Sequence, residues 1–163
     1  MSVRLLDVNL LVALVWPAHE AHETVMAWFA RTARGGWATC PLTQAGFVRI
    51  LANPAFHRDA VSPSEATKVL QANLRHPSHR FWPMDVEFPA AVAPLAGQIA
   101  GHRQITDAYL LGLVIRNEGI LATLDRSLPA LLPDMKLRSR FVEVVGPPHS
   151  ATHSKRETSG PRP

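Results

Sequence analysis

The sequence predicts an α/β protein in which a parallel β-sheet lies between two layers of helices. Short apolar runs of the kind that form buried strands alternate with longer helical segments along the chain. The 163 residues fit one compact domain with a sizeable core, since 47% of them are hydrophobic. No apolar run reaches the length of a membrane span, so we expect no membrane-embedded part.

The first third of the chain is expected to hold two strands and three helices. A short apolar run ends at Asp7, and Asn9 is placed to cap the helix after it, which Pro17 ends. Apolar periodicity, together with Gly and Pro at turns, sets the other bounds. The expected elements are, in order, a strand over 3–6, a helix between Asn9 and Pro17, a helix over 19–33, a strand over 37–40 and a helix over 41–51.

The remaining elements follow from capping signals and apolar runs. Ser62-Pro63-Ser64-Glu65 is a capping box with proline at the first helical position. Thr106 is expected to cap a strongly patterned helix that begins at Asp107. The expected elements are, in order, a helix over 63–74, a strand within 80–84, a helix over 88–100, a helix over 107–119, a strand over 120–124 and a strand over 141–145.

Composition and charge set limits on the class of protein. Cys40 is the only cysteine, which excludes an internal disulfide. The N-terminus lacks a basic leader with a cleavage site, so we expect a cytoplasmic protein. The net charge of +4 makes the chain mildly basic, which permits a nucleic-acid partner without requiring one.

The composition changes at Gly146. From there on, apolar residues give way to Pro, Ser, Thr and basic residues, a composition typical of chains that do not fold. We therefore expect a folded domain over residues 1–145 and a disordered C-terminal tail over residues 146–163.

Three aspartates are candidates for a shared site. Asp7 and Asp125 directly follow predicted strands, and Asp107 opens a predicted helix. Ligands of open parallel sheets gather beyond the carboxyl ends of the strands. Asp7 also interrupts an apolar run, where a carboxylate without a partner is costly. Three carboxylates at one edge would repel each other unless a hard cation such as Mg²⁺ joined them. Taken singly, Asp107 and Asp125 are equally consistent with a helix-dipole contact and a turn.

Four segments together carry a family resemblance: "LLDVNLLVAL", "GWATCPLTQAGFVRIL", "ITDAYLLGL" and "LATLDR". Their order and spacing resemble those of PIN-domain proteins, and more specifically of the VapC-type toxins of bacterial toxin–antitoxin pairs. The resemblance runs from residue 3 to about residue 145. It implies a PIN-like three-layer sandwich with about five parallel strands and a ribonuclease activity that depends on Mg²⁺, with Mn²⁺ as a substitute. It also implies a homodimer and a small antitoxin protein that blocks the site.

The resemblance assigns roles to individual residues. Asp7, Asp107 and Asp125 match the acids that hold the metal ion and carry catalysis in the family. The residues that match or flank supporting polar positions are Asn9, Gln44, Thr106 and Thr123. Arg126 follows Asp125 directly, so it is the basic residue expected to contact RNA near the site.

One position departs from the family pattern, which usually has glutamate where this chain has Gln44. An amide keeps an acceptor oxygen but loses the charge, so it is a weaker magnesium ligand. Whether the site binds one metal ion or two therefore remains open, and we expect weak metal binding without RNA. A PIN-like protein that binds RNA or its antitoxin without cleavage is the alternative. Phosphoryl transfer through Asp7 as nucleophile is disfavoured, because the expected domain has only two lysines, Lys68 and Lys136.

Overall fold

The five strands expected from the sequence form one parallel sheet. The structure is a computed structural model that describes residues 2–56 and 60–146. The strands in these residues are, in chain order, β1 (Arg4–Leu6), β2 (Trp37–Thr39), β3 (His79–Phe81), β4 (Ile120–Thr123) and β5 (Val142–Val144). Every pair of neighbours is parallel, in the spatial order β3-β2-β1-β4-β5. The predicted sheet is therefore confirmed, with β1 at its centre.

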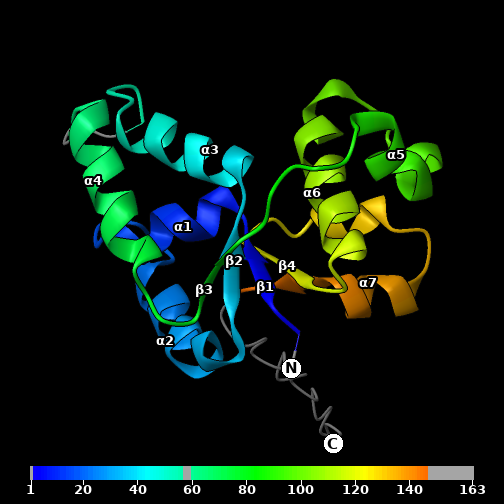
Figure 1. The fold of residues 1–163 in the computed structure, drawn as a ribbon, viewed down its shortest axis with the longest axis horizontal. Helices are drawn as coiled ribbons and strands as arrows, with labels where there is room; N and C mark the ends of the chain where they lie inside the picture. Colours follow the sequence, from blue (N-terminus) through cyan, green and yellow to red (C-terminus); the bar gives the residue numbers. More distant parts are fainter. Residues whose placement is uncertain (1, 57–59, 147–163) are drawn as a thin grey trace, which may run out of the picture.

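Helices cover both faces of this sheet (Figure 1). In the described residues the α-helices are, in chain order, α1 (Val8–Val15), α2 (His22–Thr32), α3 (Pro41–Leu51), α4 (Pro63–Leu74), α5 (Phe88–Val92), α6 (Ile105–Arg116) and α7 (Met135–Phe141). Short 3₁₀ helices accompany them: η1 (Ala33–Gly35), η2 (Ala93–Gln98), η3 (His102–Gln104) and η4 (Leu128–Leu131). Figure 1 shows α1 to α4 on one side of the sheet and α5 to α7 on the other, which confirms the three-layer sandwich.

The central strand β1 is buried on both faces. Leu5 packs into the core cluster that contains the α6 side chains, and Leu6 packs into the cluster that contains the α1 side chains. Both leucines are fully buried, and their alternation is the two-residue period of a strand between two layers. Asp7 follows Leu6 directly, so it emerges at the middle of the carboxyl edge of the sheet.

Two predicted helix caps are wrong. Asp7, and not Asn9, is the N-cap of α1, because its Oδ1 accepts a 2.7 Å hydrogen bond from the Val8 N–H. Helix α6 begins at Ile105, so Thr106 lies in its first turn and is exposed. In both cases the polar residue expected as cap stands inside the helix, within the one or two residues by which helix bounds commonly vary.

Other helix bounds also differ from the expectation. The helix expected over 88–100 ends at Val92 and continues as η2, because Pro94 has no N–H to donate to an α-helical hydrogen bond. The helix expected over 19–33 begins at His22 and changes to η1 at Ala33. Helix α7 was not expected from the sequence at all. Asp134 caps it by accepting a 2.9 Å hydrogen bond from the Leu137 N–H.

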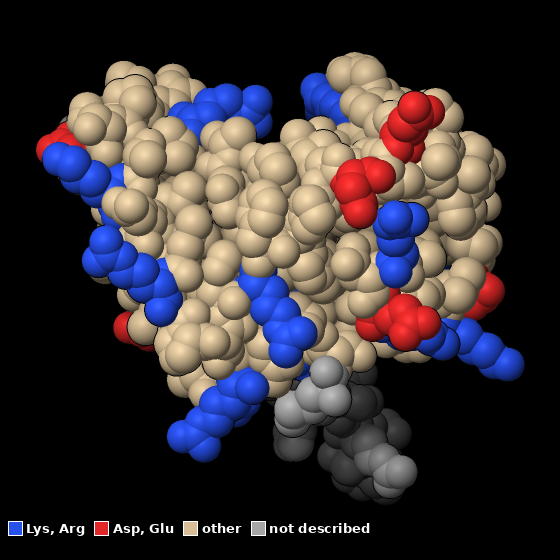
Figure 2. Space-filling view, viewed as in Figure 1, with Lys and Arg blue, Asp and Glu red and all other residues tan. Residues whose placement is uncertain are grey.

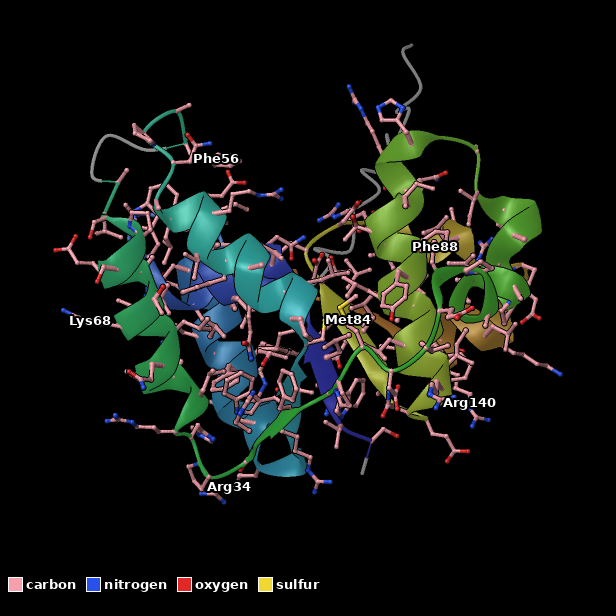
Figure 3. All side chains as sticks on the ribbon, turned by 45° about the horizontal axis from the view of Figure 1, so that its top comes forward. Arg34, Phe56, Lys68, Met84, Phe88 and Arg140 are labelled. Carbon is pink, nitrogen blue, oxygen red and sulfur yellow. The ribbon has the colours of Figure 1, made fainter. Side chains whose placement is uncertain are left out.

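The surface carries a notch between α3 and the start of α6 (Figure 2). Helix α3 begins directly after β2, and α6 carries Asp107 in its first turn. Figure 3 brings this end of the molecule forward and shows Met84 between the two groups of helices, with Phe56 beyond the far end of α3. The notch therefore opens onto the carboxyl edge of the sheet.

The described part of the chain contains no helix with the length and apolar character needed to cross a membrane. Of the tail expected over 146–163, the residues from 147 onward lie outside the described residues. The domain boundary at residue 145 and the cytoplasmic location therefore stay predictions.

Candidate active site at the carboxyl edge of the sheet

The structure brings the three predicted aspartates to one edge of the sheet. Asp7 follows β1 and Asp125 follows β4, and these strands are parallel neighbours in which Leu6 lies opposite Ala122. Asp107 arrives from the first turn of α6. The charges of Asp7 and Asp125 both raise the pKa of Asp107, so all three carboxylates lie within electrostatic reach. We call these three residues the acid cluster.

Asp107 is the least compensated member of the acid cluster. Burial, followed by the charges of Asp7 and Asp125, raises its pKa to about 6. Within the described residues, its carboxylate accepts no hydrogen bond and no basic side chain lowers its pKa. A partly buried carboxylate whose charged neighbours are other carboxylates favours a proton or a bound cation.

Asp7 is buried, yet both of its oxygens have donors. Burial raises the pKa of Asp7, while hydrogen bonds from Thr123 and Val8 act in the opposite direction. The Thr123 hydroxyl donates to Oδ2 at 2.7 Å, and the Val8 N–H donates to Oδ1 at 2.7 Å. The orientation of this carboxylate is therefore set by the protein before any ligand arrives.

Thr123 and Asn9 connect the ends of β1 and β4. The Thr123 side chain is fully buried, and its hydroxyl accepts hydrogen bonds from Asn9 Nδ2 at 3.1 Å and from the Asp125 N–H at 3.0 Å. Asn9 Oδ1 in turn accepts the Leu124 N–H at 3.1 Å. The structure thus places both predicted supporting residues between Asp7 and Asp125.

Asp125 forms the turn that its sequence context allowed. Its Oδ1 accepts hydrogen bonds from the Ser127 N–H at 2.7 Å and from the Ser127 hydroxyl at 2.8 Å. Oδ2 accepts no hydrogen bond from the described residues. Ser127 was not singled out from the sequence, although its position two residues after an aspartate is the usual signal of such a turn.

The other predicted site residues lie outside this hydrogen-bond network. Gln44 Nε2 donates to Thr39 Oγ1 at 2.9 Å, and Gln44 lines a groove between α3 and α4. Thr106 is exposed on α6. Arg126 is exposed and lines a separate pocket of about 300 Å³ beside Gly146. The roles expected for these three residues stay predictions.

The acid cluster supplies the donor type that Mg²⁺ and Mn²⁺ prefer, but not a closed cage. Among the residues that the structure describes, no three His, Cys, Asp or Glu side chains are arranged to hold a metal ion by themselves. Magnesium is usually bound by one or two carboxylates completed by water and substrate phosphate. The Asp107 carboxylate and Oδ2 of Asp125, which have no protein donors in the described part, fit such an open site.

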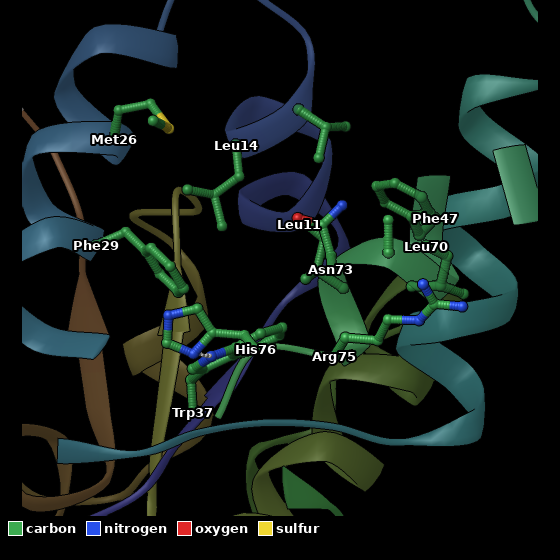
Figure 4. Close-up of a pocket in the computed structure, with 12 residues that line it drawn as sticks. Leu11, Leu14, Met26, Phe29, Trp37, Phe47, Leu70, Asn73, Arg75 and His76 are labelled. Carbon is green, nitrogen blue, oxygen red and sulfur yellow. Dashed lines mark hydrogen bonds between the residues drawn. The ribbon is translucent and has the colours of Figure 1, made fainter. Parts of the chain in front are cut away.

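A second, apolar pocket of about 460 Å³ lies away from the acid cluster, among α1, α2 and α4 (Figure 4). Leu14, Phe29 and Trp37 are among its lining residues. Trp37 Nε1 donates to His76 Nδ1 at 3.3 Å, which fixes one wall of the pocket. No member of the acid cluster lines this pocket, so it is separate from the candidate active site.

Comparison with known proteins shows the family to which this chain is related. The family model of the PIN domain matches residues 4–131. Ribonuclease VapC38 of Mycobacterium tuberculosis (strain ATCC 25618 / H37Rv) is 46% identical over 121 residues, which are 74% of this chain and 84% of that protein. Ribonuclease VapC39 of Mycobacterium tuberculosis (strain CDC 1551 / Oshkosh) is 40% identical over 124 residues, 76% of this chain and 89% of that protein.

Solved structures share the fold at low sequence identity. VapBC2 from Rickettsia felis, bound to a promoter DNA fragment, gives a TM-score of 0.60 at 11% identity and covers 88% of this chain and 99% of that one. FitAcB from Neisseria gonorrhoeae gives a TM-score of 0.56 at 19% identity and covers 85% of this chain and 95% of that one. The chain therefore belongs to the PIN-domain family, and within it to the VapC type.

Proposed function

We propose that this chain is a metal-dependent ribonuclease that hydrolyses RNA phosphodiester bonds and acts as the toxin of a toxin–antitoxin pair. The observation that carries the proposal is the acid cluster, whose mutual repulsion, added to burial, raises the pKa of Asp107 to about 6. The PIN-domain match and the ribonuclease names of the VapC relatives support it.

The chain's own residues prepare the reaction at this edge. Asp7, Asp107 and Asp125 would hold an Mg²⁺ or Mn²⁺ ion, which would lower the pKa of water and stabilise negative charge on the phosphate. Thr123 holds Asp7 and Ser127 holds Asp125, each by hydrogen bonds that fix the carboxylate. Asp107 offers a carboxylate without a protein donor in the described part of the chain. Two fixed carboxylates and one available carboxylate would together hold such an ion at this edge.

An antitoxin partner and a homodimer belong to the same proposal. Both come from the family resemblance. The structural neighbour VapBC2 was solved bound to a promoter DNA fragment, and its likeness to this chain concerns the fold. The number of metal ions depends on whether position 44 takes part, which the hydrogen bond from Gln44 to Thr39 disfavours.

Asp7→Asn tests the proposal. Asparagine keeps a side-chain oxygen for the Val8 N–H and removes a buried charge, but it places an NH₂ group where Oδ2 accepts the Thr123 hydroxyl. We therefore expect a small fall in melting temperature, which is measured beside cleavage to show that the variant is folded. We expect the wild type to cut total cellular RNA in Mg²⁺ and to stop when the metal ion is chelated. The variant should cut at least about 100-fold more slowly, because it lacks one carboxylate charge.

Asp134→Asn is the matched control for this experiment. Asp134 is also a helix N-cap that accepts a backbone N–H, but it belongs to α7 and not to the acid cluster. We expect this variant to cut RNA at the wild-type rate. Equal cleavage by the two variants would reject the assignment of Asp7. A wild type that binds RNA but leaves it intact with either metal ion would favour the non-cleaving alternative.

A further inference from the structure

Positive side chains stand on both walls of the notch that opens onto the acid cluster. Figure 2 shows one over α3 and one over the segment that leads into α6. Arg49 is the only Lys or Arg in α3, and Arg103 is the only one between residues 83 and 115. Arg49 is therefore the basic residue that α3 itself contributes, and Arg103 is the one that the segment leading into α6 contributes.

Helical spacing directs Arg49 toward the notch. Arg49 follows Leu42 by two helical turns, so both side chains leave the same side of α3. Leu42 packs against the core cluster that contains the α6 side chains, so this side of α3 faces α6. Arg49 is exposed near the C-terminal end of α3, where it also lines the groove between α3 and α4 that Gln44 lines.

Arg103 stands above the acid cluster on the other wall. It lies in η3, one helical turn before Asp107 in the chain, and it is exposed. An extended ligand that enters the notch to reach Asp107 therefore passes between the two arginines.

Both guanidinium groups are available to an incoming anion. Within residues 2–56 and 60–146, neither Arg49 nor Arg103 takes part in an ion pair or a hydrogen bond. Neither lowers the pKa of Asp107, so the arginines stand at the rim and do not neutralise the acid cluster. Guanidinium is the side-chain group best suited to bind phosphate oxygens in pairs.

We propose that Arg49 and Arg103 form a phosphate clamp, in which each binds an RNA backbone phosphate on one side of the phosphodiester that lies at the acid cluster. The clamp rests on the proposed function, because it assumes that RNA reaches these acids. Three carboxylates repel a polyanion, and a positive charge on each wall offsets this repulsion. Two fixed phosphate contacts also set which phosphodiester meets the acids.

The salt dependence of RNA binding tests the clamp. The Asp7→Asn protein, which should cut RNA at least about 100-fold more slowly than the wild type, is titrated with a fluorescently labelled single-stranded oligouridylate in Mg²⁺ at several KCl concentrations. Each phosphate contact to a single strand contributes about 0.7 to the slope of log affinity against log salt. We expect the slope to fall by about 0.7 on Arg49→Gln, by about 0.7 on Arg103→Gln and by about 1.4 on both together.

Arg34→Gln is the matched control. Arg34 is an exposed arginine in η1, which precedes β2 and therefore lies at the amino edge of the sheet, away from the notch (Figure 3). It changes the net charge by the same amount, and we expect the slope to stay at its unsubstituted value. Arg49→Lys keeps the charge at the rim and should keep most of the slope.

The outcomes separate the clamp from the enzyme activity. An unchanged slope in the double variant, or an equal loss in Arg34→Gln, would overturn the clamp. If the wild type cuts RNA while the slopes stay unchanged, the function stands and the clamp is wrong. If the slopes fall as expected but the wild type does not cut, the clamp serves an RNA-binding protein. Absence of RNA binding contradicts the clamp directly.

Discussion

The hydroxyl of Thr123 uses its full hydrogen-bonding capacity within the candidate site. It donates its one proton to Asp7 and accepts from Asn9 and from the Asp125 N–H. A buried group with every donor and acceptor satisfied is rigid, and loss of any partner leaves another group unpaired. The positions of Asp7 and Asp125 are therefore coupled through one side chain.

At the scale of single residues, Gln44→Glu tests whether position 44 belongs to the metal site. Gln44 Nε2 already donates to Thr39, so we expect a carboxylate at this position to add no ligand to the metal ion. We expect calorimetric titration with Mg²⁺ to give the same affinity, within about twofold, for wild type and variant. A tenfold gain in the variant would place position 44 in the metal shell, as the family pattern implies.

The three aspartates of the acid cluster could be found from the sequence, but the direction in which the Gln44 side chain points could not. Asp7 and Asp125 follow apolar strands, and parallel strands bring their carboxyl ends to one edge. The side of α3 that faces the acids depends on how the helix is rotated against α1 and α4, which no local pattern encodes. Asn9 was expected to cap a helix, and its hydrogen bonds to Thr123 and Leu124 depend on the pairing of β1 with β4.

At the scale of elements, α5 and α6 pack without room for a side chain at Gly112. A Cβ atom there would overlap the backbone carbonyl of Ala91 in α5. A backbone atom inside a packed helix cannot move aside as the end of a long side chain can. Because of this close approach, the short helix α5 packs directly against α6, the helix that carries Asp107.

We expect Gly112→Ala to lower the free energy of unfolding by about 2 kcal/mol in urea denaturation. The clash outweighs the gain of about 1 kcal/mol that alanine brings to a helix interior. Gly97→Ala is the control, because a Cβ there meets nothing within 4 Å, and it should change stability by less than about 0.5 kcal/mol. Similar effects of the two substitutions would show that α5 is free to shift.

Elements with local signals were predictable. The capping box is confirmed, since Ser62 Oγ accepts the Glu65 N–H at 3.2 Å and Glu65 Oε2 accepts the Ser62 N–H at 2.9 Å. Helix α7 has only seven residues, and its apolar contacts depend on packing against α6, β4 and β5. Periodicity over so short a segment does not distinguish a helix from a loop.

At the scale of the whole molecule, the acid cluster makes stability depend on pH. The pKa of Asp107 is raised from 3.8 to about 6 in the folded state, so the fold binds this proton more tightly than the unfolded chain does. The ionised carboxylate therefore destabilises the fold above pH 6. This destabilisation decreases as the pH falls through 6 and is absent below 3.8.

Asp107→Asn should remove this effect. Without divalent metal ions, we expect the variant to be about 1 kcal/mol more stable than the wild type near pH 7.5, a reduced figure because the carboxyl group is partly exposed. The difference should shrink as the pH falls through 6 and nearly vanish at about pH 3, where Asp107 is largely protonated in both states. Urea denaturation at the two pH values measures it. A variant that is less stable than wild type near pH 7.5 would show that Asp107 is stabilised by contacts and not repelled.

The alternation of strands and helices predicted that the sheet is parallel, but it did not predict the spatial order of the strands. Placing Asp107 beside Asp7 and Asp125 required the order β3-β2-β1-β4-β5 and the packing of α6 on the face of that sheet. Such contacts join residues far apart in the chain, where local sequence carries little information. The family resemblance supplied what the residues alone left open.

The pairing of Leu6 with Ala122 has a consequence for refolding. A slip of one residue between β1 and β4 would turn Thr123 to the opposite face of the sheet and separate it from Asp7. The same slip would expose core leucines, so a misaligned product loses both solubility and function. Recovered turnover per refolded molecule would then report how many molecules have their two central strands in the correct alignment.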